Sequence, residues 1–257
     1  MSLPASVSGR GYRLEVFDSL GSTNDEAMGR ARGGDPGRLW IRAAQQSGGK
    51  GRLGRQWVSP AGNLYASLLL VDAATPDRAP ELGFVAGVAL ACALSRLLGP
   101  EARIKWPNDI VVGGAKLAGI LLEATQTAGG GFACVIGVGV NCASHPQGLP
   151  YPATDLASLD CAVSPGVLLD SFAEELAGWL DQWDEGRGFA QIRAAWLLFA
   201  AGMGETAEVA MGDQRIKGVL RGLDERGRLL VDTEAGQRTI DAGDVFLPGL
   251  SEAAGQL

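Results

Sequence analysis

Gly48-Gly49-Lys50-Gly51-Arg52-Leu53-Gly54-Arg55-Gln56-Trp57 is the most informative stretch of this 257-residue chain. Four glycines and three cationic side chains lie within these ten residues. Glycine lets the main chain come close to a ligand, and Arg and Lys bind phosphate or carboxylate through charge-assisted hydrogen bonds. The stretch predicts a loop that closes over an anion such as a nucleotide or an acidic small molecule. A solvated basic loop that only confers solubility is the alternative.

Part of this loop, residues 49–54, matches the dinucleotide pattern GxGxxG. That pattern needs a strand before it and a helix directly after it. Residues 39–44 read as the strand, but Pro60 and Gly62 interrupt the place where the helix would run. The Walker sequence GxxxxGK[ST] is absent from the chain. The context therefore disfavours a nicotinamide-dependent Rossmann enzyme.

The composition is that of an ordinary globular protein, with 46% apolar and 20% charged residues. A formal charge of −7 opposes a broad nucleic-acid-binding surface, so no nucleic-acid partner is expected. The longest apolar run, residues 82–94, is shorter than the roughly 18 residues that a membrane span needs. No signal-peptide pattern is evident, and we expect a cytoplasmic protein that is not membrane-bound.

Cysteine and histidine usage excludes two further classes. The four cysteines form no CxxC pair and the chain has one histidine, which disfavours a structural zinc site and indicates reduced thiols. A hydrolytic triad would have to use His145, which precedes Pro146 in a loop, and no GxSxG sequence is present. A hydrolase triad is therefore disfavoured.

Thr23 followed by Glu26 has the spacing of a capping box, which predicts a helix that begins there and continues to about Arg32. The segment Ser22-Thr23-Asn24 would then lie at a helix N-terminus, where free N–H groups favour a polar or anionic guest. Helix capping alone would also explain these side chains.

The hydrophobic pattern predicts an α+β fold with a mixed sheet, followed by a small β-barrel of about 50 residues. Gly113-Gly114 is expected to join two strands in a hairpin, and Gly137 and Gly139 would let something lie close to a strand. We expect the larger domain to begin near Gly11, domains at 1–203 and 204–257, and a disordered segment at 251–257. The predicted strands are 12–17, 39–44, 64–71, 103–106, 110–112, 116–124, 132–142, 205–211, 214–222, 228–234, 237–241 and 244–247, and the predicted helices are 23–32, 80–98, 165–184 and 188–200.

Two lysine segments strengthen the prediction of an anion site. Lys105-Trp106-Pro107-Asn108-Asp109 places an amide and a carboxylate on a rigid corner, which suits a ribose, an adenine edge or Mg²⁺ bound to phosphate, although a simple turn would also explain it. Lys116 opens an otherwise apolar strand, where burying an ammonium group costs several kcal/mol unless an anion meets it. We therefore expect Lys116 to face a ligand.

Together these segments resemble the biotin protein ligases over nearly the whole chain. The motifs that carry the resemblance stand in the order and spacing of that family. One departure is Lys50, where the family usually has Arg; this could weaken a bidentate contact to carboxylate or phosphate. The motifs are Ser22-Thr23-Asn24, Gln46 with residues 49–57, residues 105–109, residues 116–121 and Gly137-Val138-Gly139-Val140-Asn141.

The resemblance implies a catalytic domain of the biotin/lipoate ligase type with an SH3-like C-terminal domain. It implies an enzyme that joins biotin and ATP with Mg²⁺ into biotinyl-5′-AMP and then transfers biotin to a lysine of a biotin carboxyl carrier protein of the acetyl-CoA carboxylase type. Since the larger domain would leave no room for a preceding DNA-binding motif, we expect a ligase without repressor activity.

The resemblance also implies roles for individual residues. Lys116 and Arg52 would be catalytic. Asp109 would be a metal ligand for the Mg²⁺ that accompanies ATP. Biotin would be bound by Ser22, Thr23, Asn24, Gln46, Gly49, Lys50, Gly51, Arg52, Lys116, Gly119 and Leu121, and the adenylate by Arg52, Arg55, Trp57, Asn108, Asp109, Lys116 and Asn141.

Two other functions remain open from the sequence. A lipoate protein ligase would use the same adenylation chemistry, although Ser22-Thr23-Asn24 with the glycine-rich loop favours biotin. A non-catalytic sensor of biotin or nucleotide would bind the ligands without joining them. The oligomeric state, including a homodimer, is also left open.

Overall fold

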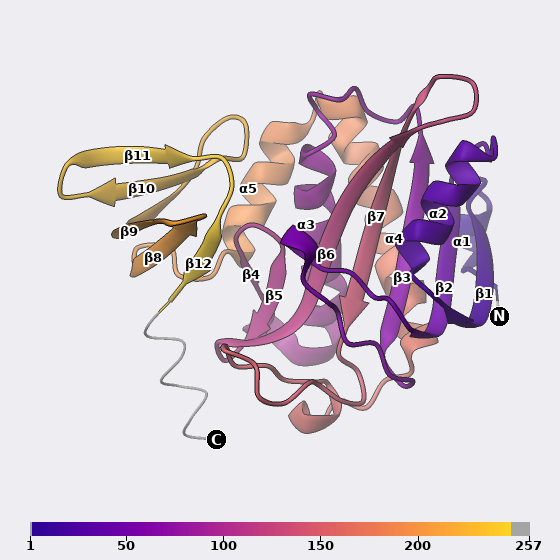
Figure 1. Ribbon diagram of the computed structural model, residues 1–257, viewed down its shortest axis with the longest axis horizontal. Coiled ribbons are helices and arrows are strands. Elements are labelled where there is room, and N and C mark those ends of the chain that lie inside the picture. The colour runs from indigo at the N-terminus through magenta and orange to yellow at the C-terminus, as the bar shows by residue number, and fades with distance from the viewer. Residues whose placement is uncertain (1, 248–257) are drawn as a thin grey trace.

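The computed structural model describes residues 2–247 of the chain as two β-sheets flanked by helices (Figure 1). A seven-stranded mixed sheet forms the larger part, and a five-stranded antiparallel sheet follows it. The expected disorder of residues 251–257 lies outside the described residues.

The larger sheet has the strand order β1-β2-β3-β7-β6-β5-β4. β1 pairs with β2 in parallel, and every other neighbouring pair is antiparallel. The hairpin predicted around Gly113-Gly114 is confirmed, because β5 and β6 pair next to this turn. The strands are β1 (Arg13–Leu20), β2 (Leu39–Gln46), β3 (Leu64–Val71), β4 (Arg103–Lys105), β5 (Asp109–Val112), β6 (Ala115–Gln126) and β7 (Phe132–Val140).

Helices cover both faces of this sheet (Figure 1). Because side chains alternate along a strand, Leu39 and Ile41 of β2 pack against α2, whereas Trp40 between them lies in the larger core on the other face. The helix on one face is α2 (Thr23–Arg32), and those on the other are α3 (Glu81–Leu98), α4 (Pro165–Trp183) and α5 (Phe189–Phe199).

α3 is the most apolar helix of the larger core. A window around it is long and apolar enough to cross a membrane by length and composition, but 61% of that window is buried inside the fold. Its neighbours are α4, α5 and the sheet. Burial against these elements explains why the helix is apolar on nearly every side.

Two details of the N-terminal region differ from the sequence prediction. The N-cap of α2 is Ser22, whose Oγ accepts a hydrogen bond from the backbone N–H of Asp25 at 3.4 Å; the predicted cap at Thr23 is wrong, because that side chain contacts Ser67 instead. The larger domain also does not begin near Gly11. The short helix α1 (Ala5–Ser8) packs on α4, and Val7 is buried in the core.

The C-terminal sheet has the order β11-β10-β9-β8-β12 and confirms the five strands expected after Gly202. Apolar residues such as Val209 and Leu220 belong to the same hydrophobic cluster as the core around α3. The SH3-like barrel and the boundary between residues 203 and 204 stay predictions. The strands are β8 (Thr206–Met211), β9 (Gln214–Leu223), β10 (Leu229–Thr233), β11 (Gly236–Ile240) and β12 (Asp244–Phe246).

Candidate active site

A cleft of about 750 Å³, its open mouth included, lies on the α2 face of the larger sheet. The basic loop of residues 48–57 and one residue of the C-terminal sheet, Asp244, form part of its wall. The structure brings most of the sequence-predicted site residues together here. These are Ser22, Thr23, Asn24, Gln46, Lys50, Gly51, Arg52, Arg55, Trp57, Asn108, Asp109, Lys116, Gly119 and Leu121.

Glycines form much of the floor of the cleft. Gly139 on β7 pairs with Gly119 on β6. A methyl group on Gly139 would collide with the ring of Trp57, and one on Gly137 would collide with Asn24. The prediction that these β7 glycines let something lie close to the strand is confirmed. The groups that lie there are side chains of this chain: Trp57 packs on Gly139, and Asn24 packs on Gly137. These two side chains form walls of the cleft that stand directly on the sheet.

Lys116 reaches this floor because β6 contains a β-bulge. Strict alternation would place residues three apart, such as Lys116 and Gly119, on opposite faces of the sheet. The pairing with β5 shifts by one residue between Lys116 and Ala118, and both Leu117 and Ala118 belong to the core cluster. The extra residue turns Lys116 to the cleft side, where its Cε lies 3.5 Å from the position of a Cβ on Gly119.

The charged groups next to this bulge form a cationic cluster. Asp109 Oδ1 lies 2.7 Å from Lys116 Nζ, and Asp109 Oδ2 lies 3.5 Å from Lys105 Nζ. Lys116 Nζ also lies 5.3 Å from the centroid of the Trp57 ring and 5.7 Å from that of Tyr151. One carboxylate between two ammonium groups leaves a net positive charge, so the cluster can still attract an anion.

A polar network lies at the other end of the cleft. Ser67 Oγ lies 2.8 Å from Thr23 Oγ1 and 2.6 Å from Asn24 Oδ1. Asn24 Nδ2 donates to Glu123 Oε2 at 2.7 Å, and Gln46 Oε1 accepts from the backbone N–H of Thr23 at 2.7 Å. Because a hydroxyl has one hydrogen, Thr23 donates to Ser67 when Ser67 donates to Asn24. The network therefore fixes the orientation of the polar groups that line this end.

The basic loop is a small hairpin that crosses the mouth of the cleft. Inside it, Gly51 N–H donates to the Arg55 carbonyl at 2.7 Å, and Trp57 N–H donates to the Gly49 carbonyl at 2.9 Å. Its tip, Leu53, is 77% exposed. The loop backbone is thus ordered by its own hydrogen bonds, and its position depends on side chains.

Arg52 is the cation of this loop that lies between the two sheets. Its Nη1 donates to Asn108 Oδ1 at 3.1 Å and lies 3.6 Å from Asp244 Oδ1. Its side chain is 23% exposed, so a ligand in the cleft would meet a partly desolvated guanidinium group. Such a group is suited to binding phosphate.

Two predicted site residues do not line the main cleft. Gly49 is buried, and a methyl group there would collide with the Trp57 carbonyl and Ser59 Oγ. Asn141 donates to the Thr154 carbonyl at 3.0 Å and lines a neighbouring cavity of about 380 Å³. Trp57 also lines both spaces. The second cavity is lined by Gln56, Trp57, Val58, Lys116, Asn141, Pro146, Leu149, Tyr151 and Ala153.

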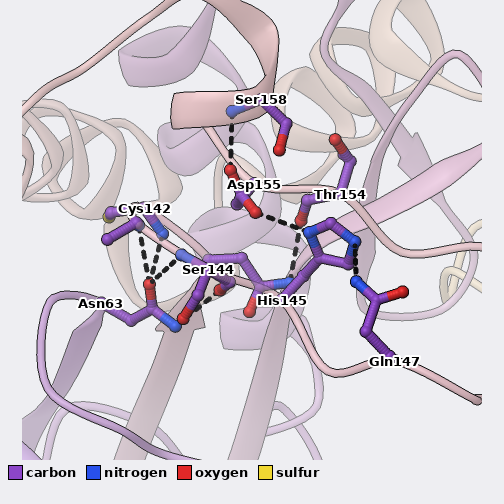
Figure 2. A network of polar contacts seen from close by, with 10 residues as sticks. Asn63, Cys142, Ser144, His145, Gln147, Thr154, Asp155 and Ser158 are labelled. Carbon is purple, nitrogen blue, oxygen red and sulfur yellow. Dashed lines mark hydrogen bonds and ion pairs between the residues drawn. The ribbon is translucent and has the colours of Figure 1, made fainter. Parts of the chain in front are cut away.

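The loop that follows β7 forms the far wall of the second cavity, and Asn63 fixes its start (Figure 2). Asn63 Oδ1 accepts hydrogen bonds from the backbone N–H groups of residues 142, 143 and 144 at 2.8, 2.8 and 3.2 Å. Further along, Lys116 N–H donates to the Pro152 carbonyl at 2.9 Å, and Thr154 N–H donates to the Lys116 carbonyl at 3.0 Å. These contacts hold Tyr151 over the ammonium group of Lys116.

His145 belongs to the same loop, between Asp155 and Gln147 (Figure 2). Its Nδ1 lies 2.6 Å from Asp155 Oδ2, and its Nε2 lies 2.8 Å from Gln147 Nε2. Asp155 Oδ1 also accepts from the backbone N–H of Ser158 at 2.7 Å. With both ring nitrogens engaged, the chain's single histidine ties the loop together.

The carboxylate side chains near the cleft are too few to hold a metal ion without further ligands from a bound nucleotide or water. Within residues 2–247, no group of three or more His, Cys, Asp or Glu side chains lies close enough to hold a metal ion. Asp109, the predicted metal ligand, already pairs with two lysines. A divalent cation here would need most of its ligands from phosphate and water.

Sequence reasoning missed several residues of the cleft. Tyr151 lies in a Pro- and Gly-rich loop that gave no signal beyond its loop character. Asp244 is the first residue of β12 in the C-terminal sheet, where nothing in the sequence points to the cleft. Gln56 and Val138 lay inside quoted motifs without an assigned role, as did Ile120. Of these residues, only Gln56, Val138 and Ile120 could have been predicted, because they lie inside the quoted motifs and every motif residue could have been treated as a candidate.

Comparison with known proteins shows the same two-part organisation. A model of the Biotin/lipoate A/B protein ligase family matches residues 19–141, and a model of the biotin protein ligase C terminal domain matches residues 203–247. The biotin--[acetyl-CoA-carboxylase] ligase of Paracoccus denitrificans is 41% identical over 236 residues, which cover 89% of this chain and 98% of that protein.

The chain belongs to the biotin/lipoate A/B protein ligase family.

Other members of this family agree with that assignment. The biotin--[acetyl-CoA-carboxylase] ligase of Mycobacterium tuberculosis is 32% identical, over 93% of this chain and 90% of that protein. The structure of the Aquifex aeolicus biotin protein ligase in complex with biotin and ATP superposes with a TM-score of 0.79 and 26% identity, covering 91% of this chain and 97% of that one. The predicted α+β fold of the biotin/lipoate ligase type is therefore confirmed.

Proposed function

We propose that this chain is a biotin--[acetyl-CoA-carboxylase] ligase, which joins biotin to a lysine of a biotin carboxyl carrier acceptor through biotinyl-5′-AMP. The main support for the proposal is the cleft with glycines in its floor. Lys116 and Arg52 line the same cleft as the polar network around Thr23 and Asn24. The relative with 41% identity bears the name of this activity, and a structural relative is described as a complex with biotin and ATP.

In the first step, a carboxylate oxygen of biotin attacks the α-phosphorus of ATP, and pyrophosphate leaves. This step brings two anions together, so its barrier falls when fixed cations screen their repulsion. Lys116 and Arg52 both line the cleft, and the residues that they contact, Asp109 and Asn108, are neighbours in the chain. The two cations can therefore screen this repulsion without reorganising at the moment of reaction. The chemistry needs no histidine base, in keeping with the engaged ring of His145.

Biotin would occupy the polar end of the cleft. Its ureido ring offers N–H donors and a carbonyl acceptor, and the hydroxyls and amides gathered there supply both kinds of partner. The aliphatic part would lie along the small and apolar residues of β6. We assign biotin binding to Ser22, Thr23, Asn24, Gln46, Gly49, Lys50, Gly51, Arg52, Lys116, Gly119 and Leu121.

The nucleotide would extend toward the second cavity. Its walls include Trp57, Val58 and Leu149, which can pack on the faces of an adenine ring, and Asn141 stands at its edge. Asn108 and Arg55 also line the main cleft. Magnesium would arrive with ATP, bound mainly by phosphate oxygens with Asp109 as a protein ligand, and would supply positive charge to the leaving pyrophosphate.

In the second step, a lysine amine of the acceptor attacks the acyl carbon of the adenylate, and AMP leaves. Until then the basic loop would exclude water that would hydrolyse the mixed anhydride.

We propose domains at 1–203 and 204–257, with an SH3-like fold for the second, and a cytoplasmic location. The oligomeric state does not enter the chemistry.

The test is a labelling assay with ATP, the carrier domain of acetyl-CoA carboxylase and either labelled biotin or labelled lipoate. We expect biotin on the acceptor and pyrophosphate in solution. Incorporation of lipoate alone would favour a lipoate ligase. Binding of biotin without any trapped acyl-adenylate would favour a sensor and would contradict the proposal.

A further inference from the structure

The two ends of the basic loop are anchored by the hydrogen bond from Gly48 N–H to the Gly21 carbonyl and by the Trp57 ring on the cleft floor. Between these ends, the loop contacts the rest of the chain mainly through its charged side chains. Within the described part of the chain, the backbone hydrogen bonds of residues 50–56 join residues of the loop to one another or to its base. The apolar side chain at its tip, Leu53, faces solvent. The position of residues 50–56 over the cleft therefore depends on where the three cations of the loop find partners.

Two of these cations are held by carboxylates from opposite sides of the cleft. Lys50 Nζ lies 2.6 Å from Asp25 Oδ1, in the first turn of α2. Arg55 forms an ion pair with Asp244, at the start of β12 in the C-terminal sheet. The contacts lie on either side of the loop tip, so together they fix the loop at two points.

The third cation, Arg52, is more available to a ligand than the other two. Arg52 Nη1 donates to the neutral Asn108 at 3.1 Å and to the Gly243 carbonyl at 3.4 Å, and it lies 3.6 Å from Asp244 Oδ1. Arg52 is also less exposed than Lys50 and Arg55, with 23% of its side chain accessible against 46% and 50%. Arg52 thus has the longest carboxylate contact of the three cations, which leaves its guanidinium group more available to a ligand than Lys50 or Arg55.

We propose that Asp25 and Asp244 are positioning residues that hold the basic loop closed over the acyl-adenylate by pairing with Lys50 and Arg55. The inference rests on the proposed function, since it concerns retention of that intermediate. It also accounts for Lys50 at a position where an arginine would be expected: a compact ammonium group suffices to meet one carboxylate oxygen, and no bidentate contact to the ligand is required.

The size of the effect follows from the exposure of the two pairs. Each is partly solvated, and such pairs are worth about 1 kcal/mol or less, which corresponds to roughly a two- to fivefold change in a rate constant. We expect Asp25→Asn and Asp244→Asn each to speed loss of preformed adenylate by about this factor, with a multiplied effect in the double variant. Formation of the adenylate at saturating biotin and ATP should change less than its loss.

The experiment preforms the adenylate from labelled biotin and ATP, removes free ligand by rapid gel filtration, and follows the label that stays with the protein. Glu26→Gln and Asp213→Asn are matched controls, since each removes one negative charge from the same helix or the same sheet without touching the loop. The conservative variant Asp25→Glu keeps the carboxylate and should slow loss relative to Asp25→Asn.

The outcomes separate this inference from the proposed function. If the unsubstituted protein forms no adenylate, the proposed function fails. If it forms adenylate, and both Asp variants retain it as long as the controls do, the positioning role is overturned. Equal loss from Asp25→Asn and from Asp25→Glu would also contradict the pairing with Lys50, provided that thermal melting shows all variants folded.

Discussion

Lys116 illustrates how a single residue acquires its environment from a local irregularity. A lysine in an apolar strand predicts a ligand on energetic grounds, and the structure places this ammonium group in the cleft between Asp109 and an aromatic ring. The bulge that turns it there could not be predicted, because an extra residue in β6 is defined only by its pairing with β5. The same limit applies to the N-cap of α2. Ser22 and Thr23 both carry a hydroxyl that could cap the helix, and Ser22 does so because Thr23 contacts Ser67, which lies far along the chain.

Replacing Lys116 by Ala should slow adenylate formation by about 100-fold or more, because a preorganised charge next to the reacting anions is lost. The fold should survive, since the β6 backbone contacts of this residue do not involve its side chain. Pyrophosphate release in a single turnover measures the step. Lys217→Ala, on an exposed stretch of β9, is the control and should react like the unsubstituted protein. A near-normal rate for Lys116→Ala would remove the assigned role.

Asp155 makes the stability of the protein depend on pH. Burial by itself would raise the pKa of this carboxyl group, but hydrogen bonds from His145 and Ser158 outweigh burial and hold the pKa below its ordinary value of 3.8. A lowered native pKa stabilises the fold above the unfolded-state pKa, and this stabilisation is lost as the pH falls through the native one.

Asp155→Asn should therefore lower the free energy of unfolding by about 1–3 kcal/mol at about pH 5, and by less at about pH 3. Urea unfolding at the two pH values measures this. Asp18→Asn, on an exposed position of β1, serves as the charge-matched control. An equal deficit at both pH values would show that the contribution is not ionic.

At the scale of elements, β7 provides both core and cleft from one strand. Its even-numbered residues, among them Ile136 and Val138, enter the larger core, while Gly137 and Gly139 face the cleft. The sequence predicted this strand and the close approach to its glycines, because apolar runs and glycine have local signatures. It could not say that Trp57 would lie there, since the identity of the neighbour depends on tertiary packing.

Gly139→Ala should displace the Trp57 ring from the floor, because the added methyl group would overlap it. We expect the apparent KM for ATP to rise about three- to tenfold, the range that one lost aromatic contact supports, and the protein to lose about 1–3 kcal/mol of stability through overpacking. Steady-state kinetics and urea unfolding measure the two effects. Gly129→Ala, in a turn with open space around it, should change neither. Unchanged kinetics for Gly139→Ala would argue against a role of Trp57 at the nucleotide.

At the scale of the whole molecule, the two sheets share a single core. Leu220 in the C-terminal sheet is 1% exposed and belongs to the same cluster as the core around α3. Trp106 Nε1 also donates to the Gly227 carbonyl across the junction, at 3.4 Å. The five C-terminal strands were predictable from their turns, but their contact with the cleft was not, because no local pattern links Arg55 with Asp244, 189 positions further along the chain.

We therefore expect one cooperative unfolding transition. All six tryptophans precede residue 200, so their fluorescence reports on the larger part of the chain. Leu220→Ala should lower the urea midpoint of this fluorescence signal, since truncating a buried leucine costs about 2–5 kcal/mol. Far-UV circular dichroism should give the same midpoint. An unchanged fluorescence midpoint would show that the sheets unfold independently.

Asp244 places a constraint on how such a chain can be recombined. Its carboxylate belongs to the C-terminal sheet, but its partners, Arg55 and Arg52, belong to a loop of the larger part. A chimera that takes its C-terminal segment from a distant relative would inherit whatever charge that relative carries at this position. Grafts that bring an acid there should keep their intermediate bound, and grafts that bring a neutral or basic residue should release it early, even when both halves fold well.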